Sequence, residues 1–550
     1  MAGFGCGLAI TLATLATGAG QAGPAEQRME TVIQDDALLL HRPAAEVRRT
    51  ARQMAGLGVD RVRLTASWGG LAPGSEDPRK PDFDATDSRA YPAEPFARLD
   101  RAVTEVREAG MEVMIDLAFF APRWAVTRSG QAGRHVRRPS AREFAYFARA
   151  LAERYSGRFA SPATDGSTLP AVRLWTTWNE PNHPVFLRPQ WQRAPRSRGQ
   201  RRGRRATKRA WRPASPHIYR RMHRAAYEQV KAVSPENKVL IGGLASEAEP
   251  GRGALRGIGP LRFTRELACV GRTLRPLRRR ACRRFRPLEA DGFAIHPYSR
   301  NTTPDARDLA RDRVQIGELD RLTDLLDALH ERGRLADPLP LYITEYGYET
   351  GPPDPRGLAP EDHARYLAQA TYLAWRRPEV RMFAQFLLND IGPDLSHPEG
   401  SPRRWADYQT GLFYHDGSPK PAVTQGFRLP LLVTPVSDAA GNTHTVIFGQ
   451  VRPRAGPQHV MIQRRAGLGR WIAETSLGLL GGGVGGPACS EFPTDPDGFF
   501  MRRVPYREGE TYRIVWMAGD RLTRLSGEIT AGPSRLLVDG IDALARRPEQ

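Results

Sequence analysis

Few cysteines, no metal-binding spacing and no long apolar run are the first features of this 550-residue sequence. Its four cysteines form no CxxC motif and no histidine-rich spacing accompanies them, so we expect neither a metal nor a cofactor. After the first 22 residues, no segment is long and apolar enough for a membrane-spanning helix. No repeat of fixed period is visible. A soluble chain of this length favours two or more globular domains.

The N-terminus has an apolar stretch, Phe4–Thr17, that ends in small residues. This pattern resembles a secretory signal peptide over residues 1–22 and predicts a secreted, extracellular protein. The positively charged start of such a signal is missing, because no lysine or arginine precedes Arg28. A loose apolar N-terminus and a membrane anchor therefore stay open as alternatives.

Secretion would expose the cysteines to an oxidising compartment, where disulfides form. Cys269 and Cys282 lie 13 positions apart and flank an arginine-rich stretch. We expect these two to pair. Cys6 would be removed with the signal, and Cys489 would then be left over.

The net charge of +21 is concentrated in two segments, 188–212 and 271–286, which contain no acidic residue. Together they supply 19 of the 21 net charges, so the rest of the chain is nearly balanced. Solvated insertions or contact with an anionic polymer would both explain them. Nucleic acid is the weakest candidate partner, because no base-reading motif accompanies the charge. The first segment follows a predicted strand and the second follows a predicted helix, which places them near opposite faces of the fold. We therefore expect no shared surface.

From about residue 30 to 428, short β-rich runs alternate with amphipathic helical stretches. Such alternation predicts parallel βαβ units. Eight units over this length match a (β/α)8 barrel with insertions at 188–212 and 271–286. A doubly wound open sheet is the second choice, but its usual glycine-rich phosphate turn is absent. The expected strands are Val32–Leu40, Arg61–Ala66, Glu112–Ala118, Val172–Trp178, Lys238–Leu244, Gly292–His296, Pro340–Thr344 and Arg381–Leu388.

After residue 428 the pattern changes to β-rich runs divided by glycine, proline and aspartate. Helical periodicity is absent there. A small all-β sandwich over 429–541 and a tail over 542–550 are therefore predicted. Three functions are open for the sandwich: it could bind sugar, attach the protein to a surface, or pack on the barrel.

Two glutamates end predicted strands. Glu180 closes the run that begins at Leu174, and Glu345 closes the run that begins at Leu341. The carboxyl ends of barrel strands form the mouth where active sites lie. Hydrolysis of a glycosidic bond needs two carboxyl groups, one to protonate the leaving oxygen and one to attack the sugar or activate water. This pair predicts a glycosidase acting on a carbohydrate.

The segments Trp178-Asn-Glu-Pro181 and Ile343-Thr-Glu-Tyr-Gly347 resemble the strand-four and strand-seven motifs of clan A glycoside hydrolases, in particular families 5 and 39. The resemblance covers about residues 30–427. It implies a retaining enzyme for β-linked glycans, with Glu180 as acid/base and Glu345 as nucleophile. It departs from the family pattern at strand three, which lacks a histidine, and at strand eight, which lacks a tryptophan.

The same resemblance implies roles for further residues. Arg63 matches the arginine that supports the nucleophile, and Phe293-Ala-Ile-His296-Pro-Tyr298 is similar to the segment whose histidine and tyrosine face it. Asn179 is suited to a sugar hydroxyl. Three tryptophans follow predicted strands and are candidates for stacking on sugar rings: Trp68, Trp124 and Trp405.

Purely structural roles are the alternative for these residues. A glutamate after a strand is often a solvated loop residue, and His296 or Tyr298 could be satisfied core groups. Arg63 could pair with a structural acid. A carbohydrate- or envelope-polymer-binding protein on a glycosidase scaffold is the alternative function. Both acids are present, which favours the enzyme.

Overall fold

The computed structural model describes residues 29–127, 135–161, 167–194, 210–247, 251–307, 310, 312–405, 408–437, 441–454, 456–474, 491–518 and 522–532. Outside this part lie the predicted signal 1–22, Cys6, Cys489, the tail 542–550 and residues 195–209 of the first basic segment. Among the described residues, no helix combines the length and apolar character that a membrane crossing needs.

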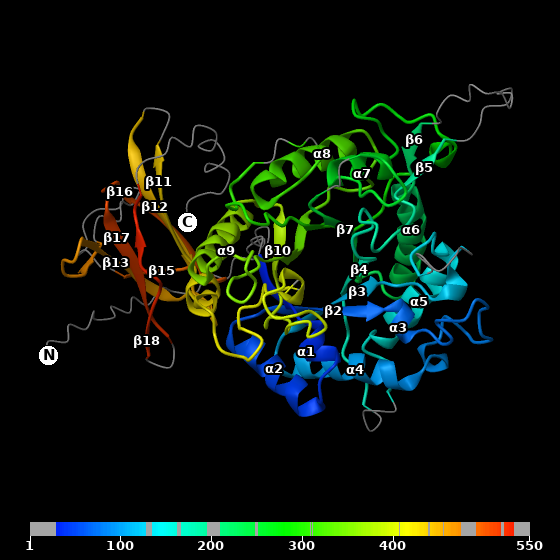
Figure 1. The fold of residues 1–550 in the computed structure, drawn as a ribbon, viewed down its shortest axis with the longest axis horizontal. Coiled ribbons are helices and arrows are strands. Elements are labelled where there is room, and N and C mark those ends of the chain that lie inside the picture. Colours follow the sequence, from blue (N-terminus) through cyan, green and yellow to red (C-terminus); the bar gives the residue numbers. More distant parts are fainter. Residues whose placement is uncertain are drawn as a thin grey trace, which may run out of the picture.

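Eight parallel strands close into a barrel in the order β1-β10-β9-β8-β7-β4-β3-β2, with helices around it (Figure 1). This confirms the predicted (β/α)8 fold. The strands are β1 (Glu30–Gln34), β2 (Arg61–Ser67), β3 (Glu112–Ala118), β4 (Leu174–Thr177), β7 (Lys238–Ala245), β8 (Gly292–His296), β9 (Leu341–Tyr346) and β10 (Val380–Phe386).

The helices follow the predicted apolar periodicity, which places one buried stripe of each against the barrel. A continuous core fills the space between strands and helices, and a smaller buried cluster fills the lumen. The helices are α1 (Asp36–Leu40), α2 (Ala44–Gly56), α3 (Trp68–Leu71), α4 (Ala93–Glu108), α5 (Ala141–Arg154), α6 (Ser215–Val233), α7 (Pro260–Leu267), α8 (Leu319–Glu331), α9 (Pro360–Trp375) and a final π-helix (Ala422–Arg428).

The first predicted strand, Val32–Leu40, is wrong in its second half. β1 ends at Gln34, and the leucine run forms α1 instead. The Asp35 carboxylate accepts a hydrogen bond from the Leu38 backbone N–H, so it caps the new helix. A short apolar run fits a strand or a helix equally well, and this cap decides between them.

The helix α7 ends at Leu267, two residues before Cys269, which a helix from the sequence pattern would have included. The Cys269 backbone has φ of 57°, a left-handed conformation that cannot continue a right-handed helix. Cys269 and Cys282 form the predicted disulfide, which ties the start of the segment 271–286 to its own interior.

Among the residues after 428 that the structure describes, the secondary structure is all-β, as predicted. One sheet has the order β11-β12-β16, and the other contains β14-β13-β17-β18 with β15 and β19 at its margins. A separate buried core joins the two sheets. The strands are β11 (Leu431–Ser437), β12 (Thr443–Gln450), β13 (His459–Ala466), β14 (Ile472–Ala473), β15 (Glu491–Pro493), β16 (Phe499–Pro505), β17 (Glu510–Met517), β18 (Thr523–Leu525) and β19 (Ile529–Thr530).

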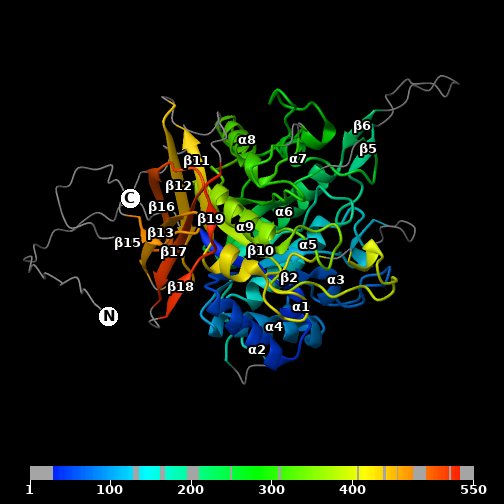
Figure 2. The ribbon, with the colours of Figure 1, turned by 60° about the vertical axis from the view of Figure 1, so that its left-hand side comes forward.

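These sheets stand against the side of the barrel that carries α9 (Figure 2). The rings of Tyr372 and Trp375 on α9 lie 5.0 and 5.1 Å from the ring of Phe448 on β12. Phe499 on β16 completes the contact, 5.8 Å from Trp375. Phe448 and Phe499 therefore belong to the barrel's core cluster.

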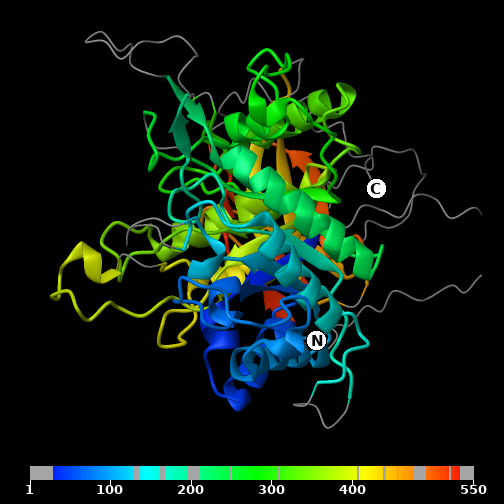
Figure 3. The same cartoon turned by 90° about the vertical axis from the view of Figure 1, so that its right-hand side faces the viewer.

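Two loops extend from the barrel to the same side. They are the hairpin of β5 (Trp191–Arg193) and β6 (Trp211–Pro213), in teal, and the loop after β10, in yellow (Figure 3). Each follows the carboxyl end of a barrel strand, β4 and β10 respectively. This side is therefore the barrel mouth, where the two glutamates end their strands.

Candidate active site

Glu180 lies just after β4, and its backbone is held in an unusual conformation. Trp178 and Glu180 both have positive φ, 72° and 39°, which non-glycine residues seldom adopt. The Glu180 N–H donates to the Gly243 carbonyl at the end of β7, over 2.9 Å. The chain thus turns sharply at the mouth and aims a half-buried carboxylate over the lumen.

Glu345 is the fifth residue of β9 and is only 9% exposed. One carboxylate oxygen, Oε1, accepts from Arg63 Nη1 at 2.5 Å, and the other, Oε2, accepts from the Tyr298 hydroxyl at 3.3 Å. Both oxygens therefore have a donor on the protein. Such contacts fix the orientation of a carboxylate in its charged form.

His296 ends β8 and stands between the two glutamates. Its Nδ1 lies 2.9 Å from Glu180 Oε1 and 3.4 Å from Glu345 Oε2. A carboxylate oxygen of Glu180 lies within 4.8 Å of one from Glu345. The two acids predicted from the strand ends, 165 positions apart in the chain, therefore meet above the lumen.

Arg63 on β2 is the centre of the site floor and is completely buried. Besides Glu345, its guanidinium donates to the carboxylate of Asp116 at 2.8 Å and to the side-chain oxygen of Asn179 at 3.1 Å. A fourth hydrogen bond goes to the Gln34 amide oxygen. Arg63 thus ties together β1, β2, β3, β9 and the turn after β4.

Burial and charge act in opposite directions on the pKa of Glu345. Burial alone would raise it, but the charges of His296 and Arg63 and the hydrogen bonds from Arg63 and Tyr298 lower it below the usual 4.5. Burial and the neighbouring Glu345 and Glu180 raise the pKa of Tyr298 well above 10, so the phenol keeps its proton as a donor. Glu345 is therefore ionised at neutral pH.

The prediction of Trp68 as a sugar platform is wrong. Its side chain is completely buried beneath the mouth, packed against Phe144 and Phe147 of α5 at ring separations of 5.5 and 5.8 Å. A ring with no exposed face cannot stack on a sugar. Trp124 is half-buried, with its edge on Trp68 and its indole N–H donating to the Pro73 carbonyl.

Trp405 lies in the loop after β10, as predicted, in a short helical turn with its ring 6.0 Å from that of His415. Its contact with sugar stays a prediction. A different aromatic group stands at the mouth: Phe119, Phe120 and Phe186 follow β3 and β4, with ring separations of 4.9 to 6.2 Å. Phe120 is 37% exposed, which leaves its ring accessible.

The sequence analysis missed Gln34, Asp116 and these phenylalanines. Asp116 had a signal, since it is an acid in the middle of an otherwise apolar strand, and such an acid needs a buried partner. It is fully buried and also accepts from the Thr176 hydroxyl at 2.6 Å. Gln34 had none, because its predicted strand continued past it.

Donor geometry also raises the question of a metal. Glu180, His296 and Glu345 could offer three ligands to a divalent cation. The guanidinium of Arg63 already occupies one oxygen of Glu345 and adds positive charge there, which disfavours a cation. A second group, His217 with Cys269 and Cys282, has its sulfurs joined in the disulfide, so no thiolate is available.

The chain is a (β/α)8 barrel with two acids at the carboxyl ends of the strands β4 and β9. No family model and no curated protein matches the chain. In structure it is similar to GH5_18 from Streptomyces cattleya in complex with GlcNAc, with 15% identity, TM-score 0.45, and coverage of 72% of this chain and 79% of that one.

Two further solved structures are similar. The β-glycosidase from the hyperthermophile Thermosphaera aggregans shares 15% identity, with TM-score 0.42 and coverage of 73% of this chain and 95% of that one. A GH39 β-xylosidase from Caulobacter crescentus shares 16% identity, with TM-score 0.42 and coverage of 81% and 84%.

Proposed function

We propose that this protein is a retaining glycoside hydrolase that cleaves β-linked bonds of oligo- or polysaccharides. The observation that carries the proposal is the approach of Glu180 and Glu345 to within 4.8 Å. Retaining enzymes hold their two carboxyl groups about 5–5.5 Å apart, whereas inverting enzymes keep about 6.5–9.5 Å to admit a water molecule. The separation favours direct attack on the sugar.

In the first step, a Glu345 oxygen attacks the anomeric carbon and the glycosidic C–O bond breaks. Glu180 gives its proton to the departing oxygen, which leaves as an alcohol. In the second step, water gives a proton to Glu180 and attacks the same carbon, and the ester bond to Glu345 breaks. Two inversions at one carbon return the starting configuration, and both glutamates recover their original protonation.

The surrounding residues suit these roles. Arg63 and Tyr298 keep Glu345 charged and correctly oriented for attack. His296 contacts both acids, so it lies beside Glu180 while the charge on that carboxyl group changes between the two steps. Asn179 and the exposed ring of Phe120 supply a hydrogen-bonding group and an apolar face for the sugar.

The proposal includes secretion, which the Cys269–Cys282 disulfide supports because such bonds persist in oxidising compartments. The test of this part is expression of the full-length chain in its native host, followed by N-terminal sequencing of the protein from the medium. Recovery of a chain shortened by about 22 residues is expected. Retention of the whole chain in the cytosol would contradict it.

The catalytic test is hydrolysis of a panel of aryl β-glycosides and β-linked polysaccharides by the wild type, Glu345→Ala and Glu180→Ala. Glu345→Ala should lower kcat by at least about three orders of magnitude, since the nucleophile is lost. Azide should restore activity to it and give an α-glycosyl azide. Azide added to Glu180→Ala should instead give the β-glycosyl azide, because it then attacks the glycosyl-enzyme.

The matched control is Glu247→Ala, which removes an acid from the same mouth. Glu247 follows β7, and its carboxylate pairs with Arg300 at 2.9 Å. Its activity should stay within about twofold of the wild type. A wild type that is inert on the whole panel but retains a polysaccharide in a pull-down would replace the enzyme with a binding protein.

A further inference from the structure

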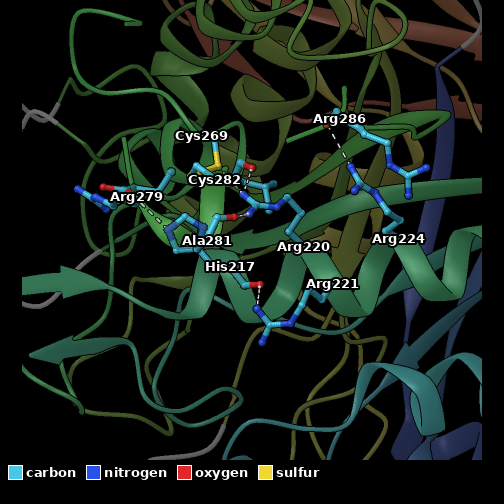
Figure 4. The surroundings of a disulfide bond; sticks show 11 residues. His217, Arg220, Arg221, Arg224, Cys269, Arg279, Ala281, Cys282 and Arg286 are labelled. Carbon is cyan, nitrogen blue, oxygen red and sulfur yellow. Dashed lines mark hydrogen bonds and ion pairs between the residues drawn. A yellow bond between two sulfur atoms is a disulfide. The ribbon is translucent and has the colours of Figure 1, made fainter. Parts of the chain in front are cut away.

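A second concave site lies beside α6. Figure 4 shows the arginines of this helix near the disulfide. The site is a cavity of about 250 Å³ lined by Arg220, Arg221 and Arg224 from α6, together with Glu228 and Arg286. Four arginines therefore line one cavity, together with a single glutamate. The cavity shares no lining residue with the site around Glu180 and Glu345.

The positive charge of the cavity is poorly compensated within the described part of the chain. No described carboxylate forms an ion pair with Arg220, Arg221 or Arg224, and Glu228 reaches only Arg286, at 3.8 Å. Two other acids act on the cluster from a distance: Glu289 on Arg224, and Glu266, which is paired with Arg279 at 2.5 Å, on Arg220. The cavity thus has a net charge of +3, although Arg220 is only 7% exposed.

The arginines are held in place by hydrogen bonds to neutral groups. Arg220 donates to the carbonyls of Leu267 and Ala281, at 2.8 and 2.6 Å. Arg224 donates to the carbonyl of Arg286 at 3.1 Å, and the Cys269–Cys282 disulfide fixes the segment that supplies these acceptors. The cluster is therefore preorganised, and little side-chain entropy remains to be lost when an anion binds.

Burial and the repulsion between these cations both lower pKa values within the cluster. Burial, followed by the charges of Arg224 and Arg221, lowers the pKa of Arg220 to about 10. Burial and the charge of Arg286 likewise lower the pKa of Arg224. An anion in the cavity would reverse this repulsion, so the arrangement favours an occupied site.

We infer that this cavity binds a phosphate or sulfate group, either as the free ion or carried on an anionic polysaccharide. Guanidinium groups bind tetrahedral oxyanions through paired N–H donors, and a dianion neutralises a +3 cavity better than one carboxylate does. The site is separate from the proposed hydrolase centre, and its occupancy can be tested without any activity assay.

The expectation that the two basic segments share no surface stays a prediction, but α6 lies between their described ends. α6 begins two residues after the hairpin β5–β6, and Arg224 contacts the second segment through the Arg286 carbonyl. Arg138, which donates to Gln192 of β5, has its pKa lowered by burial and then by the charge of Arg221. Arg221 and Arg224 of α6 therefore each have a basic neighbour on the side of one of the two segments.

The experiment measures binding to the full chain by calorimetry, at constant ionic strength set with chloride. The probes are inorganic phosphate, sulfate, dextran sulfate and neutral dextran. The cavity variant is Arg221→Gln with Arg286→Gln, two exposed side chains whose loss should leave the fold intact. The matched control is Arg42→Gln with Arg52→Gln, which removes the same charge from exposed positions elsewhere.

The cavity variant should weaken phosphate or sulfate binding at least tenfold, and the control should stay within about twofold. Glu228→Gln should strengthen binding about threefold, because it removes the one repelling charge, and misfolding cannot produce that gain. Binding of the free ions identifies an ion site, whereas binding of dextran sulfate alone identifies a polymer-borne group. Equal weakening in both double variants, or no binding of any anionic probe, would overturn the inference.

Discussion

Replacing Arg63 by methionine should destabilise the barrel strongly, and more so at higher pH. The guanidinium is the shared partner of Asp116 and Glu345, whose side chains are 0% and 11% exposed. Methionine has a similar length but no charge, so both carboxylates would remain buried without their cation. Leaving one member of a buried ion pair unpaired costs about 3–5 kcal/mol. We expect a loss of that size in the free energy of unfolding at pH 7.5.

The sign of the pH dependence follows from the carboxylates. In the wild type the pKa of Glu345 is lowered, so its contribution to stability is present above 4.5 and is lost as the pH falls through the lowered value. Without Arg63, burial raises the pKa of Glu345, and further raises that of Asp116, which burial already elevates. A raised pKa destabilises as the pH rises. The difference between the two proteins should therefore widen from pH 4.5 to 7.5.

The assay is urea unfolding followed by tryptophan fluorescence at both pH values, with Arg61→Met as the control. Arg61 lies on the same strand and pairs with Glu30 at 2.7 Å, but that pair is partly open to solvent. Its loss should cost only about 1 kcal/mol, with little change between the two pH values. Equal losses for the two variants, or a loss in Arg63→Met that does not change with pH, would refute the reasoning.

Substitutions at three further sites test other parts of the structure by the same unfolding measurement. Trp68→Ala should cost about 3–5 kcal/mol, because it empties a buried aromatic site, and a loss below about 1 kcal/mol would contradict that burial. Cys269→Ser with Cys282→Ser should cost about 3 kcal/mol, as expected for opening a loop of this length, and the wild type in reductant should match it. Lys420→Met should cost about 3–5 kcal/mol by stranding Asp390, and adding Asp390→Asn should recover part of the loss; no recovery would show that their 2.6 Å pair is not responsible.

Much of the barrel could be predicted because its strands are short apolar runs separated by long amphipathic helices. β3 and β8 have the predicted bounds, and β2 and β7 differ by one residue at one end. The failure at Val32–Leu40 has a local cause, since a cap at Asp35 divides one apolar run into two elements. Periodicity cannot detect such a division when both parts are apolar.

Site residues could be predicted where they lay in a motif, as Arg63, His296 and Tyr298 do, or where they stood out by their position along one strand. Glu180 and Glu345 did so, because each is an acid at the end of an apolar run. The roles of Gln34 and Asp116 depend on β1 and β3 flanking β2 in the closed barrel, and no local pattern records this. Trp68 was misjudged because its burial depends on residues of α5, some 75 positions further along the chain.

The contact between α9 and the C-terminal sheets limits how the β-domain can move. Tyr372 and Trp375 are packed into the same core as Phe448 and Phe499, and the buried Arg452 donates to the Phe427 carbonyl at the junction. A sugar-binding module on a flexible tether can sweep the surface of a polymer and raise the local concentration of its enzyme. A domain that shares a hydrophobic core with the barrel cannot do this. Its orientation toward the barrel mouth is fixed when the chain folds. Any ligand on these sheets would therefore meet the barrel at one set angle.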